Sequence, residues 1–402
     1  MKVAIIGGGA AGFFSAISVK ENYPNANVTI FEKTTKVLSK VKVSGGGRCN
    51  VTNGTTSISD LSKAYPRGGR KLKKAFKIFN TKHTMEWFES RGVALKIEAN
   101  NHVFPVSDSS QTVIDCFMNE CKRLKINIRT KASVQEIIPN ENQLDIVFSN
   151  NEKARFDKVI VATGGSPKRK NLEWLETLGH KIENPVPSLF TFNMKKEPII
   201  KLMGVAVKSA LVTIQGTKLK MTAPLLITHW GMSGPAIIKI SAFGARVLSD
   251  AKYDFKAQIN WSGIQNANVV QEDLGNIAQN HPQKQLQNLK PYGLPERLWQ
   301  FLLAKAELPK EKRWSELGKK GLNKLTSVLT YDVYQVHGKT TFKEEFVTCG
   351  GVSLESIDFN TMQSRICKNL YFAGEVMDID GITGGYNFQS AWTTGFIAGK
   401  LK

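Results

Sequence analysis

The first thirty-two residues constrain the fold more than any other part of the chain. Residues 2–6 form a short apolar run, typical of a buried parallel strand, and lead directly into a G-x-G-x-x-G motif over residues 7–12. Helix-compatible spacing over residues 13–20 and a second apolar run over residues 28–31 follow, and Glu32 closes that second run. Strand, glycines, helix, strand and acid in this order predict a βαβ unit that binds a dinucleotide.

Each glycine of the motif has a steric role. Gly7 permits the tight turn off the strand, Gly9 lets a pyrophosphate approach the backbone, and Gly12 lets the helix pack closely on the sheet. The helix N-terminus then offers unpaired N–H groups and its positive dipole end to phosphates. Glu32 is expected to accept hydrogen bonds from the adenosine ribose, and its charge disfavours NADP. A tight βα turn without a ligand is the alternative interpretation.

A second glycine-rich segment covers residues 44–53, which read Ser-Gly-Gly-Gly-Arg-Cys-Asn-Val-Thr-Asn. Three consecutive glycines do not form a regular element, and such bare backbone suits the close approach of another molecule. Lys40 and Arg48 are expected to supply positive charge for phosphate. A mobile surface loop is the alternative.

The C-terminal part repeats the pattern of the first thirty-two residues, an apolar run followed by a glycine-rich turn and a helix. Residues 370–375 form an apolar run ending in Gly-Glu, and a Gly-Gly-Tyr-Asn turn over residues 384–387 precedes a helix over residues 388–401. This turn is a second anion site at a helix N-terminus, and two such turns suit a long cofactor, which favours FAD over NAD. An apolar strand over residues 158–165, ending in Thr-Gly-Gly, is expected to join the first sheet beside the nucleotide.

The pattern between these segments predicts an insertion. We expect an α/β FAD-binding Rossmann domain over residues 1–187 and 348–402, interrupted by a second domain over residues 188–347. Alternating strands predict a small antiparallel unit or β-barrel over 188–262 and 330–347, with a final strand over 341–347, and a proline-broken, lysine-rich helical part over 263–329. Three local features are also expected, namely turns over 231–235 and 349–352 and a helix over 109–124 capped by Ser107 or Asp108.

Composition is that of a globular protein in a reducing compartment. Hydrophobic residues make up 41% and charged residues 22% of the chain, as in globular proteins. Its length of 402 residues predicts more than one domain. The motif starts near residue 3, so no signal peptide is expected, and no uncharged stretch is apolar enough to span a membrane. Five cysteines without C-x-x-C spacing favour the cytoplasm, and six histidines without paired spacing predict no metal site.

The formal net charge is +21, and the basic residues are clustered. One cluster spans residues 63–82 and a second spans residues 305–324. Such surfaces attract nucleic acid, anionic lipid or an acidic partner, and a solvated helix face is the alternative. No RNA-recognition or helix-turn-helix motif accompanies them. The first cluster consists of Lys63, Arg67, Arg70, Lys71, Lys73, Lys74, Lys77 and Lys82.

Taken in order, these segments resemble the HI0933-like flavoproteins, including aminoacetone-oxidase-like and BaiN-like members. The resemblance covers the whole chain and also includes residues 228–235, which read Thr-His-Trp-Gly-Met-Ser-Gly-Pro. It implies a glutathione-reductase-like FAD domain with an inserted barrel and helical domain. It further implies tightly bound FAD and hydride transfer between the flavin and a small organic substrate, of the amine, amino acid or enone class.

The resemblance also implies roles for individual residues. Glu32 would hold the ribose, Val134 would contact adenine through its backbone, and Glu375 would bond the linking chain of FAD. His229 is a candidate for a base near the flavin, and a hydrogen-bonded core histidine is the alternative. The expected FAD-binding residues are Gly7, Gly9, Ala10, Ala11, Gly12, Glu32, Lys33, Lys40, Ser44, Gly45, Gly46, Gly47, Arg48, Cys49, Asn50, Val134, Thr163, Gly164, Gly165, Gly374, Glu375, Gly384, Gly385, Tyr386 and Asn387.

The chain departs from disulfide reductases of this fold. Cys49 has no partner cysteine within ten residues, so we expect a packed thiol and no dithiol chemistry. No second G-x-G-x-x-G is present, which leaves NAD(P)H as a transient reductant. An RNA-associated flavoprotein that uses the basic cluster, and a flavin-binding protein without turnover, are the alternatives to the small-molecule enzyme. The oligomeric state stays open.

Overall fold

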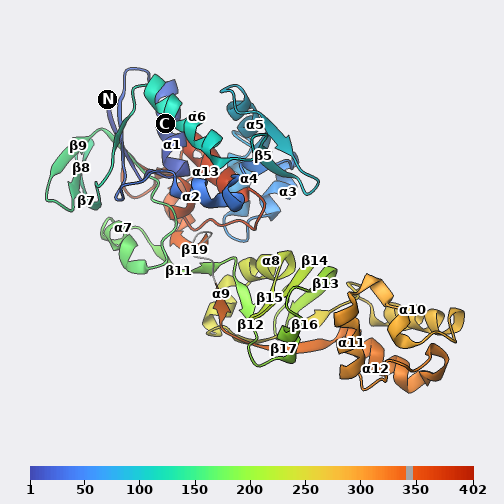
Figure 1. Cartoon of the computed structure of the whole chain (residues 1–402). Helices are drawn as coiled ribbons and strands as arrows, with labels where there is room; N and C mark the ends of the chain where they lie inside the picture. The colour runs from blue at the N-terminus through green and yellow to red at the C-terminus, as the bar shows by residue number, and fades with distance from the viewer. Residues whose placement is uncertain (341–346) are drawn as a thin grey trace. The chain divides into compact units, whose positions relative to one another are not determined.

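The computed structural model describes residues 1–340 and 347–402 (Figure 1). The chain divides into two compact units, Met1–Ser188 with Phe342–Lys402, and Leu189–Thr341. Most of the strand expected over 341–347 therefore lies outside the described residues.

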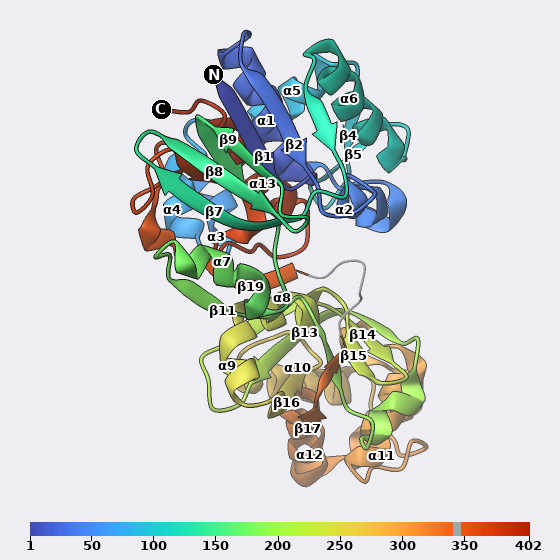
Figure 2. The same cartoon turned by 90° about the vertical axis from the view of Figure 1, so that its left-hand side faces the viewer.

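A seven-stranded sheet forms the centre of the first unit, and Figure 2 shows its first two strands side by side. Numbered along the chain, its five parallel strands lie in the order 3-2-1-4-5. Successive strands are therefore added toward one edge of the sheet up to β6 and toward the other edge from β10, and the strand order reverses between β1 and β10. Ligands of open α/β sheets bind outside the carboxyl ends of the strands at this reversal. In spatial order the strands are β6 (Asn127–Arg129), β2 (Asn27–Phe31), β1 (Lys2–Ile6), β10 (Lys158–Val161) and β22 (Leu370–Phe372), followed by the antiparallel β21 (Gln363–Ser364) and β20 (Ile357–Asp358).

Two helices from opposite ends of the chain pack against each other beside this sheet (Figures 1 and 2). They are α1 (Ala10–Asn22) and α13 (Tyr386–Ala398), and most side chains of both are buried. Their contact is close because Gly399 faces Ser18, where a Cβ on the glycine would lie 2.4 Å from the serine Cβ. The Ser18 hydroxyl donates to the Phe396 carbonyl at 2.8 Å. The α/β Rossmann class predicted from the sequence is confirmed.

Smaller elements complete the first unit. Short antiparallel sheets are formed by β3 (Thr52–Asn53), β5 (His102–Pro105) and β4 (Leu95–Ile97), by β7 (Val134–Asn140), β8 (Gln143–Phe148) and β9 (Lys153–Phe156), and by β11 (Ile182–Ser188) with β19 (Val347–Val352). The remaining helices are α2 (Ser39–Val43), α3 (Ile58–Lys63), α4 (Gly69–Ala75), α5 (Thr81–Glu89), α6 (Ser110–Arg123) and α7 (Glu173–Thr177).

Two local predictions in the first unit were wrong. Ser109 caps α6, because its hydroxyl accepts from the Gln111 N–H at 3.3 Å, whereas Ser107 or Asp108 was expected. The expected turn over residues 349–352 belongs to strand β19. Its glycines mark close backbone approach, since a Cβ on Gly350 would lie 2.6 Å from the Asn184 carbonyl oxygen.

The second unit combines one sheet with helices. Its strand order is β17 (Asp332–His337), β16 (Asp254–Asn260), β13 (Ala206–Ile214), β14 (Lys220–Thr228), β15 (Gly231–Ser233), β12 (Thr191–Asn193) and β18 (Lys339–Thr340). Its helices are α8 (Pro235–Phe243), α9 (Ala245–Asp250), α10 (Ala267–Asn280), α11 (Glu296–Lys305) and α12 (Gly318–Thr330). The first three residues of the expected turn over 231–235 form strand β15, where Gly231 is needed because a Cβ would lie 2.1 Å from the Phe192 carbonyl oxygen.

Candidate cofactor site

The G-x-G-x-x-G turn lies at the carboxyl end of β1, next to the reversal in strand order. Gly7 has φ +116°, and a Cβ there would lie 2.3 Å from the Ala162 carbonyl oxygen. A Cβ on Gly12 would lie 1.9 Å from the Gly7 oxygen, so no side chain fits at either position. Gly9 caps α1 without a side-chain hydrogen bond, and a Cβ there would meet no atom within 4 Å. The first N–H groups of α1, including those of Ala10 and Ala11, have no partner within the helix.

Glu32 holds this turn from the neighbouring strand. Its two carboxylate oxygens accept from the backbone N–H groups of Gly8 at 2.9 Å and Thr34 at 2.8 Å. Each oxygen keeps a free lone pair, which can accept from a ribose hydroxyl. The Glu32 carbonyl accepts from the Ala132 N–H at 2.9 Å, which brings the segment leading to Val134 alongside. Lys33 is exposed beside Glu32.

Three segments far apart in sequence meet at Glu375. Lys40 pairs with one carboxylate oxygen at 3.0 Å, and the Thr348 N–H donates to the other at 2.8 Å. Gly165 lies so close that a Cβ would be 2.7 Å from Glu375, and Thr163 lies against Gly7. The segment after β10 thus reaches both the first glycine turn and Glu375.

The loop over residues 44–50 is built from left-handed backbone. Gly45, Gly46 and Gly47 have φ values of 57°, 68° and 88°, and a Cβ on either of the last two would meet nothing within 4 Å. Cys49 is fully buried, and burial raises the pKa of its thiol to about 12. The thiol therefore stays protonated at neutral pH and is not a nucleophile there.

Arg48 is held by acidic side chains of the protein itself. Its guanidinium pairs with Glu98 at 2.8 Å and Asp108 at 3.5 Å, and it lies 3.9 Å from the centre of the Phe104 ring. Its positive charge is thus compensated by the protein, and Lys40 is the cation of the expected set that lies beside Glu375.

The C-terminal glycine turn is held by the loop after Cys49. Gly385 has φ +84°, and a Cβ there would lie 2.3 Å from the Thr52 carbonyl oxygen. The Asn53 amide donates to the Gly384 carbonyl at 3.0 Å. With its amide oriented to satisfy both ends, Asn50 accepts from the Gly385 N–H at 3.1 Å. The structure therefore brings the 44–53 loop and the 384–387 turn together at the N-terminus of α13.

Further side chains complete this turn. Asn387 accepts from the Gly381 N–H at 2.8 Å and donates to the Gly381 carbonyl at 2.9 Å. Tyr65, which sequence reasoning did not single out, donates its hydroxyl to the Tyr386 carbonyl at 2.7 Å. Thr348 was also missed, and its buried hydroxyl has no hydrogen-bond partner among the described residues. No local sequence signal marks either residue, since each acts through a contact distant along the chain.

His229 does not lie in a buried core, as a core histidine would. It lies between β14 and β15 in the second unit, is exposed, and contacts the Trp230 ring at 4.3 Å between centroids. A short hairpin connection projects its side chain outward, so it is not a core histidine.

The donor set fits a flavin dinucleotide. Two helix N-termini with glycine turns offer N–H groups to phosphates and to an electron-rich ring, and Glu32 offers carboxylate acceptors to a ribose. The unpartnered Thr348 hydroxyl beside Glu375 is a further polar group available to a ligand. Together, fold and site define an FAD-dependent oxidoreductase of the Rossmann class.

The family follows from comparison with known proteins. Residues 1–401 match the family described as HI0933-like protein Rossmann domain, and the chain belongs to this family. It is 27% identical to the 3-dehydro-bile acid delta(4,6)-reductase of Clostridium scindens, over 99% of this chain and 98% of that protein. It is 29% identical to the ribosomal RNA dihydrouridine synthase of Escherichia coli, over 98% of this chain and 96% of that protein.

A solved structure shares the fold. The 3-ketosteroid delta1-dehydrogenase of Sterolibacterium denitrificans superposes with a TM-score of 0.52 at 11% identity, over 99% of this chain and 98% of that chain. Among the described residues, no helix is long and apolar enough to cross a bilayer.

Proposed function

We propose that the protein reduces a carbon–carbon double bond conjugated to a carbonyl group, the enone class of substrate. The observation that carries this proposal is the chemistry shared by the two relatives that match nearly the whole chain. One name describes reduction of double bonds in a 3-oxo bile acid, and the other describes formation of dihydrouridine from uridine. Both reactions add two hydrogens across a bond polarised by a carbonyl group. The amine and amino acid classes have no counterpart in these two names.

FAD, when bound, supplies the hydride, and NAD(P)H is the class of reductant that restores its reduced form. The chain's own residues bind and orient the cofactor. We assign the pyrophosphate to the N–H groups of Ala10 and Ala11, the ribose to Glu32, and the flavin end to Gly385 and its neighbours. Cys49 supports the loop backbone and exchanges no electrons, because its thiol is buried and protonated.

A uracil base within RNA is the substrate candidate that one further observation favours. The relative of higher identity of the two is the ribosomal RNA enzyme, and the formal net charge of this chain is +21. A strongly basic protein attracts polyanions, whereas a bile acid is a single small anion. A small free enone is the other candidate.

The test uses the reduced holoprotein under anaerobic conditions. A steroid 4-en-3-one, uridine and ribosomal RNA are added separately, and flavin reoxidation is followed by its visible absorbance. We expect at least one conjugated substrate to reoxidise the flavin and to gain two hydrogens by mass spectrometry. Reduction of the oxidised flavin by amines, with no reoxidation by any conjugated alkene, would contradict the proposal.

A further inference from the structure

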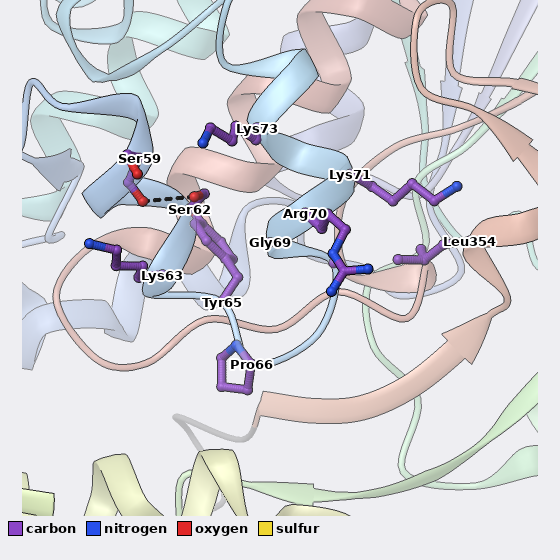
Figure 3. Close-up of a pocket in the computed structure, with 11 residues that line it drawn as sticks. Ser59, Ser62, Lys63, Tyr65, Pro66, Gly69, Arg70, Lys71, Lys73 and Leu354 are labelled. Carbon is purple, nitrogen blue, oxygen red and sulfur yellow. Dashed lines mark hydrogen bonds between the residues drawn. The ribbon is translucent and has the colours of Figure 1, made fainter.

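A basic hollow lies in the first unit beside helices α3 and α4. Its volume is about 660 Å³, and Lys63, Arg70, Lys71 and Lys73 contribute to its wall. Figure 3 shows Lys63 and Arg70 on either side of Tyr65. The cofactor-binding segments do not use these cations.

The positive charge of this face is concentrated on α4 and is uncompensated. Every exposed side chain from residue 70 to residue 77 is cationic. Arg70, Lys71, Lys73 and Lys74 lie on α4, and Lys77 follows it directly. None of the five pairs with an acidic residue in the part of the chain that the structure describes. Cations one helical turn apart repel one another, so the arrangement is unfavourable unless an anion binds.

The other members of the predicted cluster are compensated. Lys63 pairs with Asp60 at 2.8 Å and Lys82 with Glu86 at 3.8 Å. Arg67 turns inward and pairs with the fully buried Asp380, so it does not belong to the surface. The unpaired cations therefore form a narrower face than the sequence indicated, which we call the α4 face.

Residues at the hollow contact the C-terminal glycine turn over 384–387 and the segment before it. Tyr65 lines the hollow and bonds the carbonyl of Tyr386, and the Ala64 carbonyl accepts from the Ile382 N–H at 2.9 Å. Gly68 lies so close to Ile379 that a Cβ would be 2.6 Å from its side chain. A ligand held on the α4 face is thus anchored next to the segment that leads into Gly384 and Gly385.

We infer that the α4 face binds the phosphate backbone of an RNA whose uracil base is the substrate, an inference that rests on the proposed function. The cations repeat at about one helical turn, about 5.4 Å along the axis, which suits a chain of phosphates better than a single anion. Leu72, Ala75 and Phe76 point into the core. The helix therefore lacks the exposed apolar face by which amphipathic helices bind lipid.

The test measures binding by the oxidised holoprotein without reductant, so that it does not depend on turnover. The probe is a fluorescein-labelled RNA stem-loop with uridines in the loop, followed by anisotropy over a salt series. Replacing Arg70, Lys71, Lys73 and Lys74 by Gln is expected to weaken binding at least about tenfold. It should also lower the slope of log K against log salt by up to about 3, at about 0.7 for each single-strand phosphate contact.

A matched variant removes the same charge elsewhere. Lys310, Lys312, Lys319 and Lys320 are replaced by Gln, and RNA affinity should stay within about twofold of the wild type if the α4 face is specific. Equal losses in both variants would refute the α4 face, as would retained binding in the first variant. Stronger binding to vesicles of phosphatidylcholine with phosphatidylglycerol than to RNA would also refute it. Retained FAD content in each variant shows that the fold is intact.

The two proposals fail in distinguishable ways. RNA binding that depends on the α4 face, without reduction of any uracil, would refute the proposed reaction on RNA and leave the surface in place. Reduction of a small enone by the wild-type protein, with no RNA affinity, would refute the surface and leave the reductase in place.

Discussion

Gly385 gives a quantitative test of the C-terminal turn, because the chain offers a matched control. Gly385 and Gly92 have similar left-handed backbone, with φ of +84° and +80°. A Cβ on Gly385 would lie 2.3 Å from the Thr52 carbonyl oxygen, whereas a Cβ on Gly92 would meet nothing within 4 Å. Alanine at either position therefore costs the left-handed conformation, about 1–2 kcal/mol, and only Gly385→Ala adds a backbone collision.

The collision adds about 1–3 kcal/mol, the usual cost of overpacking, so Gly385→Ala should lower the free energy of unfolding by about 2–5 kcal/mol. Urea denaturation of the apoprotein measures both variants, because bound FAD would otherwise contribute to stability. FAD content after gel filtration is measured separately. We expect Gly385→Ala to lose FAD and Gly92→Ala to keep it. Equal destabilisation with equal FAD content would refute the tight contact between this turn and residue 52.

Two further predictions concern the N-terminal half of the site. Glu32→Gln replaces an acceptor oxygen by a donor and should weaken FAD binding at least about tenfold, since a charged hydrogen bond contributes about 1.5–3 kcal/mol. Equilibrium dialysis measures this, with the exposed Glu141→Gln as control, and equal affinity of both variants would contradict the ribose role. Cys49, with a pKa raised to about 12 by burial, should be ionised at pH 8 in only about one molecule in 10,000. Ellman's reagent should therefore modify it only after unfolding, and rapid labelling of the folded holoprotein would contradict this assignment.

Local patterns in the sequence predicted the core of the first unit well. The strands β1 and β2 and the helix α1 occupy the expected segments. Apolar runs, helical spacing and the glycine motif predict them because each is a pattern among neighbouring residues. The apolar strand ending near Thr163 joins β1 as expected, because a buried parallel strand must pair inside the sheet. The family and its cofactor also followed from motifs that are contiguous in sequence.

Other features were decided by contacts that the sequence does not display. The glycines of β15 and β19 looked like turns, yet they are strand residues. At these positions another backbone lies within 3 Å of the place a Cβ would occupy. Arg67 looked like a surface cation, but the buried Asp380 draws it inward, since an unpaired buried carboxylate is costly. His229 looked like a core residue, but the short connection between two strands exposes it.

The cofactor site shows the same division. Sequence alone determined which glycines turn and which acid ends β2, because each of these depends on a few adjacent residues. Tertiary structure alone decided that Thr52 and Asn53 hold the turn at Gly384 and Gly385, and that Tyr65 bonds Tyr386. More than three hundred residues separate the partners in each of these pairs. Such contacts depend on how the whole chain buries its apolar surface, and no local pattern encodes that result.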